Sequence, residues 1–168
     1  FIIRASEDID ALTINTKKIN DFVTEVDVTS EKIIIDSLRD AYPNHSFLGE
    51  ESGLSHEAEN LWIIDPLDGT TNFLHKFPQY CISIALQQKG EISQAVIYDP
   101  NRNDLFTASK GQGAFLNDRR IRVSKKRKLK ECLIGTGLPF RDFKYLQTYL
   151  KMMEEVVLNT QGIRRPGA

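Results

Sequence analysis

Apolar residues recur at helical spacing in two long segments of the chain. Between residues 28 and 42 they stand at positions 34, 35, 38, 41 and 42, and Pro43 ends the pattern. Between residues 143 and 158 they stand at positions 143, 146, 149, 150, 153, 156 and 157. Residues three and four apart lie on one face of an α-helix, so each segment is predicted to be an amphipathic helix.

Between these helices the pattern changes to short apolar or alternating runs, which are typical of β-strands. Turn residues separate the runs, among them Lys89-Gly90 and Asn117-Asp118. The runs cover residues 46–49, 61–64, 80–88, 91–98, 105–108, 114–117, 119–123 and 131–136. The closely spaced runs from 80 to 123 predict a meander of antiparallel strands, and the whole chain therefore predicts a mixed α+β fold.

The most informative stretch runs from Leu61 to Phe73. Its first four residues form a solid apolar run, as a strand buried on both faces does. We expect the strand to end at Asp65-Pro66, because proline lacks a backbone donor and forces the preceding residue into an extended conformation. Asp68 then supplies a second carboxylate. Gly69-Thr70 precede a predicted helix start, whose N–H groups would attract phosphate.

Two carboxylates three residues apart suit a hard divalent cation such as Mg²⁺, which binds oxygen ligands and keeps several waters. Without a cation the two charges would repel each other. The alternative is a β-hairpin, since Asp-Gly is a strong two-residue turn signal. The stretch favours a strand followed by a turn and a helix, because the residues after Gly69 do not alternate.

Composition narrows the class of protein. The chain has 168 residues, 40% of them hydrophobic, which suffices for one globular domain. Its 22 basic and 23 acidic residues give a net charge of −1, so no global attraction to nucleic acid or anionic membranes is expected. No run approaches the roughly eighteen apolar residues of a membrane span and no leader opens the chain, so we expect a cytoplasmic protein. Cys81 and Cys132 match no metal spacing and are predicted to be buried free thiols.

Three motifs follow one another along the chain: Val23-Thr-Glu-Val-Asp27, Gly49-Glu-Glu-Ser52 and Trp62-Ile-Ile-Asp-Pro-Leu-Asp-Gly-Thr-Thr-Asn72. In this order they resemble the inositol monophosphatase family of magnesium-dependent, lithium-sensitive phosphatases, in its bacterial SuhB-like branch. The resemblance continues through residues 96–100 and 111–117 to the end of the chain. It implies the layered α-β-α-β-α sandwich of the sugar phosphatase superfamily, with residues 1–168 as a single domain truncated at both ends.

The resemblance also implies a metal site. Glu50, Asp65, the backbone carbonyl of Leu67, and Asp68 would hold two or three Mg²⁺ ions, two of them about 4 Å apart as in two-metal displacement. From the residues alone, the adjacent acids Glu50 and Glu51 would be predicted to form a solvated surface.

The same resemblance implies catalytic and substrate-binding residues. Thr70, held by Asp27, would orient the attacking water, and Glu50 acts with them. The N–H groups of Gly69 and Thr70 would bind the phosphate, and Gly167 and Ala168 would contact the substrate. Asp27 could also be a helix N-cap, a common role for aspartate.

The implied reaction is hydrolysis of a phosphate monoester, with myo-inositol monophosphate as the leading substrate and Mg²⁺ as the cofactor. Rival substrates in the superfamily are fructose 1,6-bisphosphate, 3′-phosphoadenosine compounds and histidinol phosphate. The resemblance also implies a homodimer. A rival of another class is a regulatory protein that associates with RNA polymerase or RNA, because five of the six residues 125–130 are basic. Since no aromatic residue is interleaved, a solvated loop is the alternative.

Members of the family complete their second metal site with the aspartate of a Trp-Asp pair far downstream. Here the only tryptophan, Trp62, is followed by Ile63. Glu50, Asp65 and Asp68 alone would leave a magnesium ion with few protein ligands. We therefore expect residues 1–168 to be part of a longer chain and to hydrolyse little when made alone.

Overall fold

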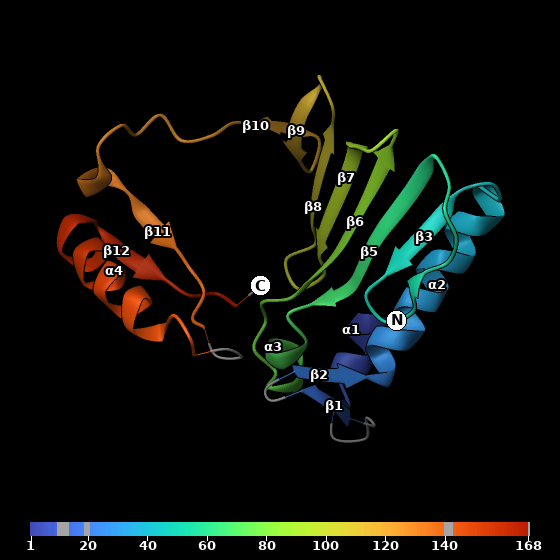
Figure 1. Cartoon of the computed structure of the whole chain (residues 1–168), viewed down its shortest axis with the longest axis horizontal. Coiled ribbons are helices and arrows are strands. Elements are labelled where there is room, and N and C mark those ends of the chain that lie inside the picture. Colours follow the sequence, from blue (N-terminus) through green and yellow to red (C-terminus); the bar gives the residue numbers. More distant parts are fainter. Residues whose placement is uncertain (10–13, 19–20, 140–142, 168) are drawn as a thin grey trace.

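The computed structural model describes residues 1–9, 14–18, 21–139 and 143–167, and one large sheet dominates it (Figure 1). Eight strands form this sheet in the order β10-β9-β8-β7-β6-β5-β3-β4. They are β3 (Ser46–Gly49), β4 (Gly53–Leu54), β5 (Asn60–Asp68), β6 (Cys81–Gln88), β7 (Glu91–Asp99), β8 (Asp104–Ser109), β9 (Gly113–Leu116) and β10 (Arg119–Ile121).

Antiparallel pairing joins the strands from β5 to β10. The hairpin between β9 and β10 turns at Asn117 and Asp118, whose φ angles of 47° and 63° are both left-handed. Two positive φ angles belong to the turn type whose twist suits a two-residue hairpin. The predicted meander is confirmed, although β10 ends at Ile121, before the predicted boundary.

One pair in the sheet is parallel: β3 lies beside β5. The helix α2 (Glu25–Ala41) leads into β3 and packs against these strands. Ile35 of α2, Phe47 of β3 and Ile64 of β5 form a buried cluster. This cluster holds the helix on the parallel pair, so that the last residues of both strands have fixed positions.

A second buried cluster joins α1 (Ile2–Ser6), the start of α2, the end of β5 and α3 (Thr70–Leu74). The rings of Phe73 and Tyr80 meet edge to face in it, with centroids 5.3 Å apart. The antiparallel pair β1 (Ile14–Lys18) and β2 (Asp21–Thr24) leads directly into α2. The members of the cluster are Ile2, Ile9, Val26, Leu67, Phe73 and Tyr80.

A smaller layer lies apart from the large sheet. β11 (Leu133–Gly135) and β12 (Gly162–Arg164) form a parallel pair next to α4 (Leu146–Asn159), and the 3₁₀ turn η2 (Leu129–Glu131) precedes β11. α2, the large sheet, the β11–β12 pair and α4 follow one another across the molecule (Figure 1). The predicted mixed α+β architecture is confirmed. No helix in the described ranges is long and apolar enough to cross a membrane.

Several predictions about the bounds or burial of single elements were wrong. α4 begins at Leu146, after the predicted residue 143, and β11 spans Leu133–Gly135, inside the predicted range 131–136. α2 begins at Glu25, before residue 28, because Thr24 caps it through the N–H groups of Val26 and Asp27. β5 continues to Asp68, since a bulge accommodates the proline at position 66. Residues 61–63 are half-buried, because α2 covers one face of β5 (Figure 1).

Candidate active site

The parallel pair β3–β5 brings two predicted metal ligands together. Gly49 at the end of β3 lies opposite Ile64 of β5, and the Glu50 N–H donates to the Ile64 carbonyl over 3.1 Å. Glu50 and Asp65 therefore follow their strands at the same level. A hydrogen bond also links the two side chains. Ligand sites in sheets with parallel strands commonly lie just beyond the carboxyl ends of those strands.

A bulge in β5 places the next acid. Asp65 pairs with Ser83 and Asp68 with Cys81, so three steps along β5 match two steps along β6. Proline cannot donate to the ladder and occurs inside sheets at such bulges, which redirect side chains next to active sites. The Leu67 N–H, freed from the ladder, donates to Asp65 Oδ1 over 3.1 Å. Pro66 thus sets the geometry between the two aspartates.

The electrostatics of Asp65 show how crowded the acids are. Burial raises the pKa of the Asp65 carboxyl above its ordinary value of 3.8, and the charges of Asp68 and then Asp27 raise it further. Hydrogen bonds with Glu50 and the Leu67 N–H lower the pKa and only partly offset these effects. Acids that disfavour each other's ionisation form a site that a cation would stabilise.

The predicted magnesium ligands offer oxygen atoms only. Within the described residues, no three side chains of His, Cys, Asp or Glu form a group that could hold a metal ion. Mg²⁺ is usually bound through one or two carboxylates, keeps several waters and takes substrate phosphate oxygens as further ligands. Glu50, Asp65, Asp68 and the Leu67 carbonyl are ligands of the type that Mg²⁺ takes, and their assignment as its ligands stays a prediction.

Asp27 connects α2 to the turn after β5. Its Oδ2 accepts hydrogen bonds from the Thr24 N–H at 2.8 Å and from the Thr24 hydroxyl at 2.5 Å. Its Oδ1 accepts one from the Thr70 hydroxyl at 3.0 Å, and the residue is only 1% exposed. Asp27 is the third residue of the helix, where it closes a capping box, so its interpretation as an N-cap is wrong.

Gly69 lets the chain turn from β5 into α3. Its φ of 98° and ψ of 32° are left-handed, a conformation that glycine adopts without steric cost. Thr70 follows as the first residue of α3, and its hydroxyl lies 3.1 Å from the Leu67 carbonyl. The first N–H groups of a helix have no partner within it. The turn therefore gathers a hydroxyl, a carbonyl and backbone donors beside the acids.

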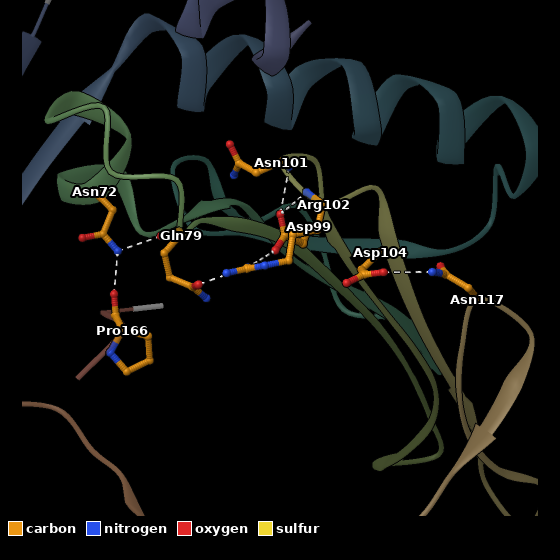
Figure 2. Close-up of polar contacts among 8 residues, drawn as sticks. All are labelled: Asn72, Gln79, Asp99, Asn101, Arg102, Asp104, Asn117 and Pro166. Carbon is orange, nitrogen blue, oxygen red and sulfur yellow. Dashed lines mark hydrogen bonds and ion pairs between the residues drawn. The ribbon is translucent and has the colours of Figure 1, made fainter. Parts of the chain in front are cut away.

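The end of the chain reaches the same helix. The side-chain amide of Asn72 in α3 donates to the Pro166 carbonyl over 3.1 Å (Figure 2). The predicted substrate contact Gly167 thus lies beside α3, whereas Ala168 lies outside the described residues.

Sequence reasoning missed Glu31, a carboxylate of α2 that is 3% exposed. Its oxygens accept hydrogen bonds from the N–H groups of Glu51 at 2.8 Å and Ser52 at 2.9 Å. A Cβ at Gly49 would lie 2.3 Å from the Glu31 carboxyl carbon, so any side chain there would displace the Glu31 carboxylate. Glu31 therefore holds the turn that carries Glu50. Its spacing of four from Asp27, which puts both on one helix face, was the available signal.

Cys81 also contacts the acids. Its Sγ lies 3.7 Å from Asp68 Oδ2. Burial, followed by the charges of Asp68 and Asp65, raises the pKa of the Cys81 thiol to about 12. The thiol therefore stays protonated at neutral pH and donates to Asp68. Cys81 and Cys132 are free, as predicted, but each is only half-buried, because both lie near polar partners.

The basic residues of 125–130 belong to a longer exposed segment. Every residue from Arg119 to Lys130 is exposed, and residues 122–127 have no regular structure. The segment runs from the edge strand β10 to η2. Its cationic side chains are therefore exposed to solvent. The segment runs away from the ends of β3 and β5 (Figure 1).

Comparison with known proteins identifies relatives of nearly the whole chain. The chain is 49% identical over 173 residues to a protein of Pseudomonas aeruginosa named Nus factor SuhB, and covers 64% of it. A solved SuhB structure from Bartonella henselae matches with a TM-score of 0.95 at 43% identity, over 99% of this chain and 65% of the other. An IMPase/NADP phosphatase solved with Mg²⁺ and phosphate matches with a TM-score of 0.81 at 26% identity, over 99% of this chain and 62% of the other.

The chain thus spans between 62 and 65% of the length of these relatives. The motifs around Asp27, Glu50 and Asp65 converge in the structure on one group of acids. A model of the inositol monophosphatase family matches residues 1–168. The chain belongs to the inositol monophosphatase family.

Proposed function

We propose that the protein hydrolyses a phosphate monoester with Mg²⁺ as cofactor. The observation that carries this proposal is the position of Glu50 and Asp65 at the same level after the parallel strands β3 and β5, with the hydrogen-bonded Asp27–Thr70 pair at the turn that follows. A relative solved with Mg²⁺ and phosphate supports it.

Glu50, Asp65, Asp68 and the Leu67 carbonyl would hold the magnesium. The bound ion would supply a positive charge that acidifies water and stabilises the negative charge of the transferring phosphoryl group. The bulge at Pro66 sets the spacing between Asp65 and Asp68. Glu31 holds the turn that carries Glu50. These backbone contacts support the proposal, because donors held in position before a ligand binds stabilise charge more effectively.

The Asp27–Thr70 pair would orient the attacking water. Because the Thr70 hydroxyl donates its proton to Asp27, its oxygen lone pairs remain to accept a hydrogen bond from water. In the reaction the water oxygen bonds to phosphorus, the ester P–O bond breaks, and the released alcohol takes up a proton. The N–H groups of Gly69 and Thr70 would hold the phosphate through the reaction.

Family membership supports myo-inositol monophosphate as the substrate. The test uses the intact natural protein that contains this chain, with a panel of inositol phosphate, fructose 1,6-bisphosphate, a 3′-phosphoadenosine compound and histidinol phosphate. Phosphate release should require Mg²⁺ and be fastest with inositol phosphate, and Li⁺ should inhibit it. Preference for another member of the panel would refute the substrate, and Mg²⁺-dependent release from none of them would refute the function.

A second candidate function is association with RNA polymerase or RNA. The homodimer that the family resemblance implies is a separate proposal. The exposed basic segment 119–130 favours the association, because clustered cations attract nucleic acid and acidic protein surfaces. The name Nus factor of the Pseudomonas aeruginosa relative is consistent with such a role.

Charge reversal separates the two functions. The triple variant K125E/K126E/K128E should lose RNA polymerase or RNA in a pull-down, while its Mg²⁺-dependent hydrolysis stays normal. Retained association would contradict the role of segment 119–130. Light scattering on the same protein tests the homodimer.

A further inference from the structure

We propose that Asn72 is a positioning residue that sets where residues 164–167 meet the alcohol part of the substrate; this inference rests on the proposed phosphatase function. The Asn72 amide nitrogen donates to two backbone carbonyls, those of Gln79 at 2.7 Å and Pro166 at 3.1 Å (Figure 2). A primary amide has two N–H donors, so both are used. One side chain thus ties α3 to a segment 94 positions later in the chain.

Gly167 brings the backbone of that segment unusually close to the amide. Its φ of 96° is left-handed, and a Cβ built there would lie 2.8 Å from the Asn72 nitrogen. No residue with a side chain fits this place unless Asn72 or the segment moves. Contact and conformation therefore both require glycine where the segment meets α3.

Arg102 and Asp99 hold Gln79, whose backbone carbonyl is the other one that Asn72 binds. The Gln79 side-chain oxygen accepts a hydrogen bond from Arg102 Nη1 at 3.1 Å, and the same nitrogen donates to Asp99 Oδ2 at 2.6 Å (Figure 2). Burial favours the neutral form of Asp99, but hydrogen bonds from Arg102 and two backbone N–H groups outweigh it and hold the pKa of Asp99 below its ordinary value. The ion pair therefore stays charged at neutral pH, and Gln79 is fixed between Arg102 and Asn72.

The Asn72 contacts link the expected binding positions of the phosphate and the alcohol parts of the substrate. The phosphate half would lie at Gly69 and Thr70, where α3 begins, and Asn72 stands two residues further along the same helix. The distance from this turn to residues 164–167 is set by the Asn72 bond to Pro166. The alcohol half, a polyhydroxylated ring in the proposed substrate, would lie against this second segment. Loosening the bond should weaken recognition of the alcohol half and leave phosphate binding intact.

The test compares Asn72→Asp with Asn44→Asp in the intact natural protein. Asn72→Asp replaces a donor to two carbonyls by a charged acceptor, whereas Asn44 is exposed in the turn after α2. Asn72→Asp should raise KM for inositol phosphate roughly three- to thirtyfold, as expected for one or two lost hydrogen bonds, with kcat nearly unchanged. The inhibition constant of inorganic phosphate should stay at its original value, and amide exchange at residues 160–167 should become faster. Asn44→Asp should change none of these.

Gly167→Ala provides a second variant that leaves Asn72 in place. It should raise KM in the same direction, and Gly90→Ala controls for backbone strain, because Gly90 has a φ of 81° but open space around it. If the inhibition constant of inorganic phosphate rose as much as KM for inositol phosphate, the proposal would be overturned, since this would indicate general damage to α3. Unchanged exchange at residues 160–167 in Asn72→Asp would also overturn it. An unmodified protein without phosphatase activity would refute the proposed function instead, and the exchange measurement would still decide whether Asn72 anchors the segment.

Discussion

At the scale of single residues, the charge of Asp65 that would bind a cation also destabilises the folded protein when no cation is bound. Asp65 is buried next to Asp68, and both effects raise its pKa, so its ionised form costs folding free energy in the absence of a cation. The folded protein binds this proton more tightly than the unfolded chain does. Stability from Asp65 is therefore present at low pH and is lost as pH rises from 3.8 through the higher folded-state pKa.

Removing one of these charges should separate stability from activity. In chelator at pH 7, Asp65→Asn and Asp68→Asn should each keep or raise the melting temperature, and the gain for Asp65→Asn should shrink at pH 4. Turnover should fall by at least roughly a hundredfold, the scale of losing one charge-stabilising group. Thermal unfolding with EDTA at both pH values, together with phosphate release at saturating Mg²⁺, measures both. Near-normal turnover in either variant would show that the metal assignment is wrong.

Thr70 should affect catalysis without affecting metal affinity. Thr70→Ala removes the hydroxyl that Asp27 holds, and turnover should fall by roughly a hundredfold, as for a misplaced reactant. Thr71→Ala is the matched control, because Thr71 is the exposed neighbour in α3. Calorimetry should give the same Mg²⁺ affinity for both variants. An equally large loss of Mg²⁺ binding in Thr70→Ala would make Thr70 a direct ligand.

At the scale of elements, the pattern of apolar and turn residues predicted those strands that pair with a neighbour in the chain. The hairpins from β6 to β10 could be predicted, because each strand pairs with its neighbour across a short turn. The grouping of Glu50 with Asp65 was implied by family motifs, while the parallel pairing that creates it joins strands that are not consecutive, because β4 comes between them in the chain. The bulge at Pro66 and the bonds of Glu31 could not be predicted, because their partners lie on other elements.

Glu31 should stabilise the junction between α2 and the turn after β3. In Glu31→Gln one carboxylate acceptor becomes an N–H₂ donor that faces a backbone N–H, so the free energy of unfolding should fall by about 1–3 kcal/mol. Mg²⁺ affinity should weaken as well, because the turn carries Glu50. Chemical denaturation and calorimetry measure the two effects, with Asp40→Asn on the exposed face of α2 as the control. If both variants behaved alike, Glu31 would have no part in placing Glu50.

At the scale of the whole molecule, apolar side chains remain at the surface. Val96, Ile97 and Leu105 in the sheet are between 36 and 41% exposed, and α4 has no buried residue. Exposed apolar patches and an open edge strand promote association between chains.

Residues 1–168 made alone should therefore associate and show little turnover. Size exclusion with light scattering should detect species larger than the monomer mass of 19.2 kDa, and inositol phosphate with saturating Mg²⁺ should yield little phosphate. The intact natural protein is the control. A monodisperse, fully active monomer of residues 1–168 would contradict this expectation and show that Glu50, Asp65 and Asp68 suffice as acidic ligands.

The unequal turn lengths in the sheet also imply an order of assembly during folding. Only Lys89 and Gly90 separate β6 from β7, whereas residues 69–80 separate β5 from β6 and residues 50–59 separate β3 from β5. Longer loops close more slowly than short ones, so the β6–β7 hairpin is expected to form before β5 and β3 join it. Glu50, Asp65 and Asp68 would then come together late in folding. Pulse-labelled hydrogen exchange should protect β6 and β7 before β3 and β5, so that the repulsion between the acids arises only after the hairpin is in place.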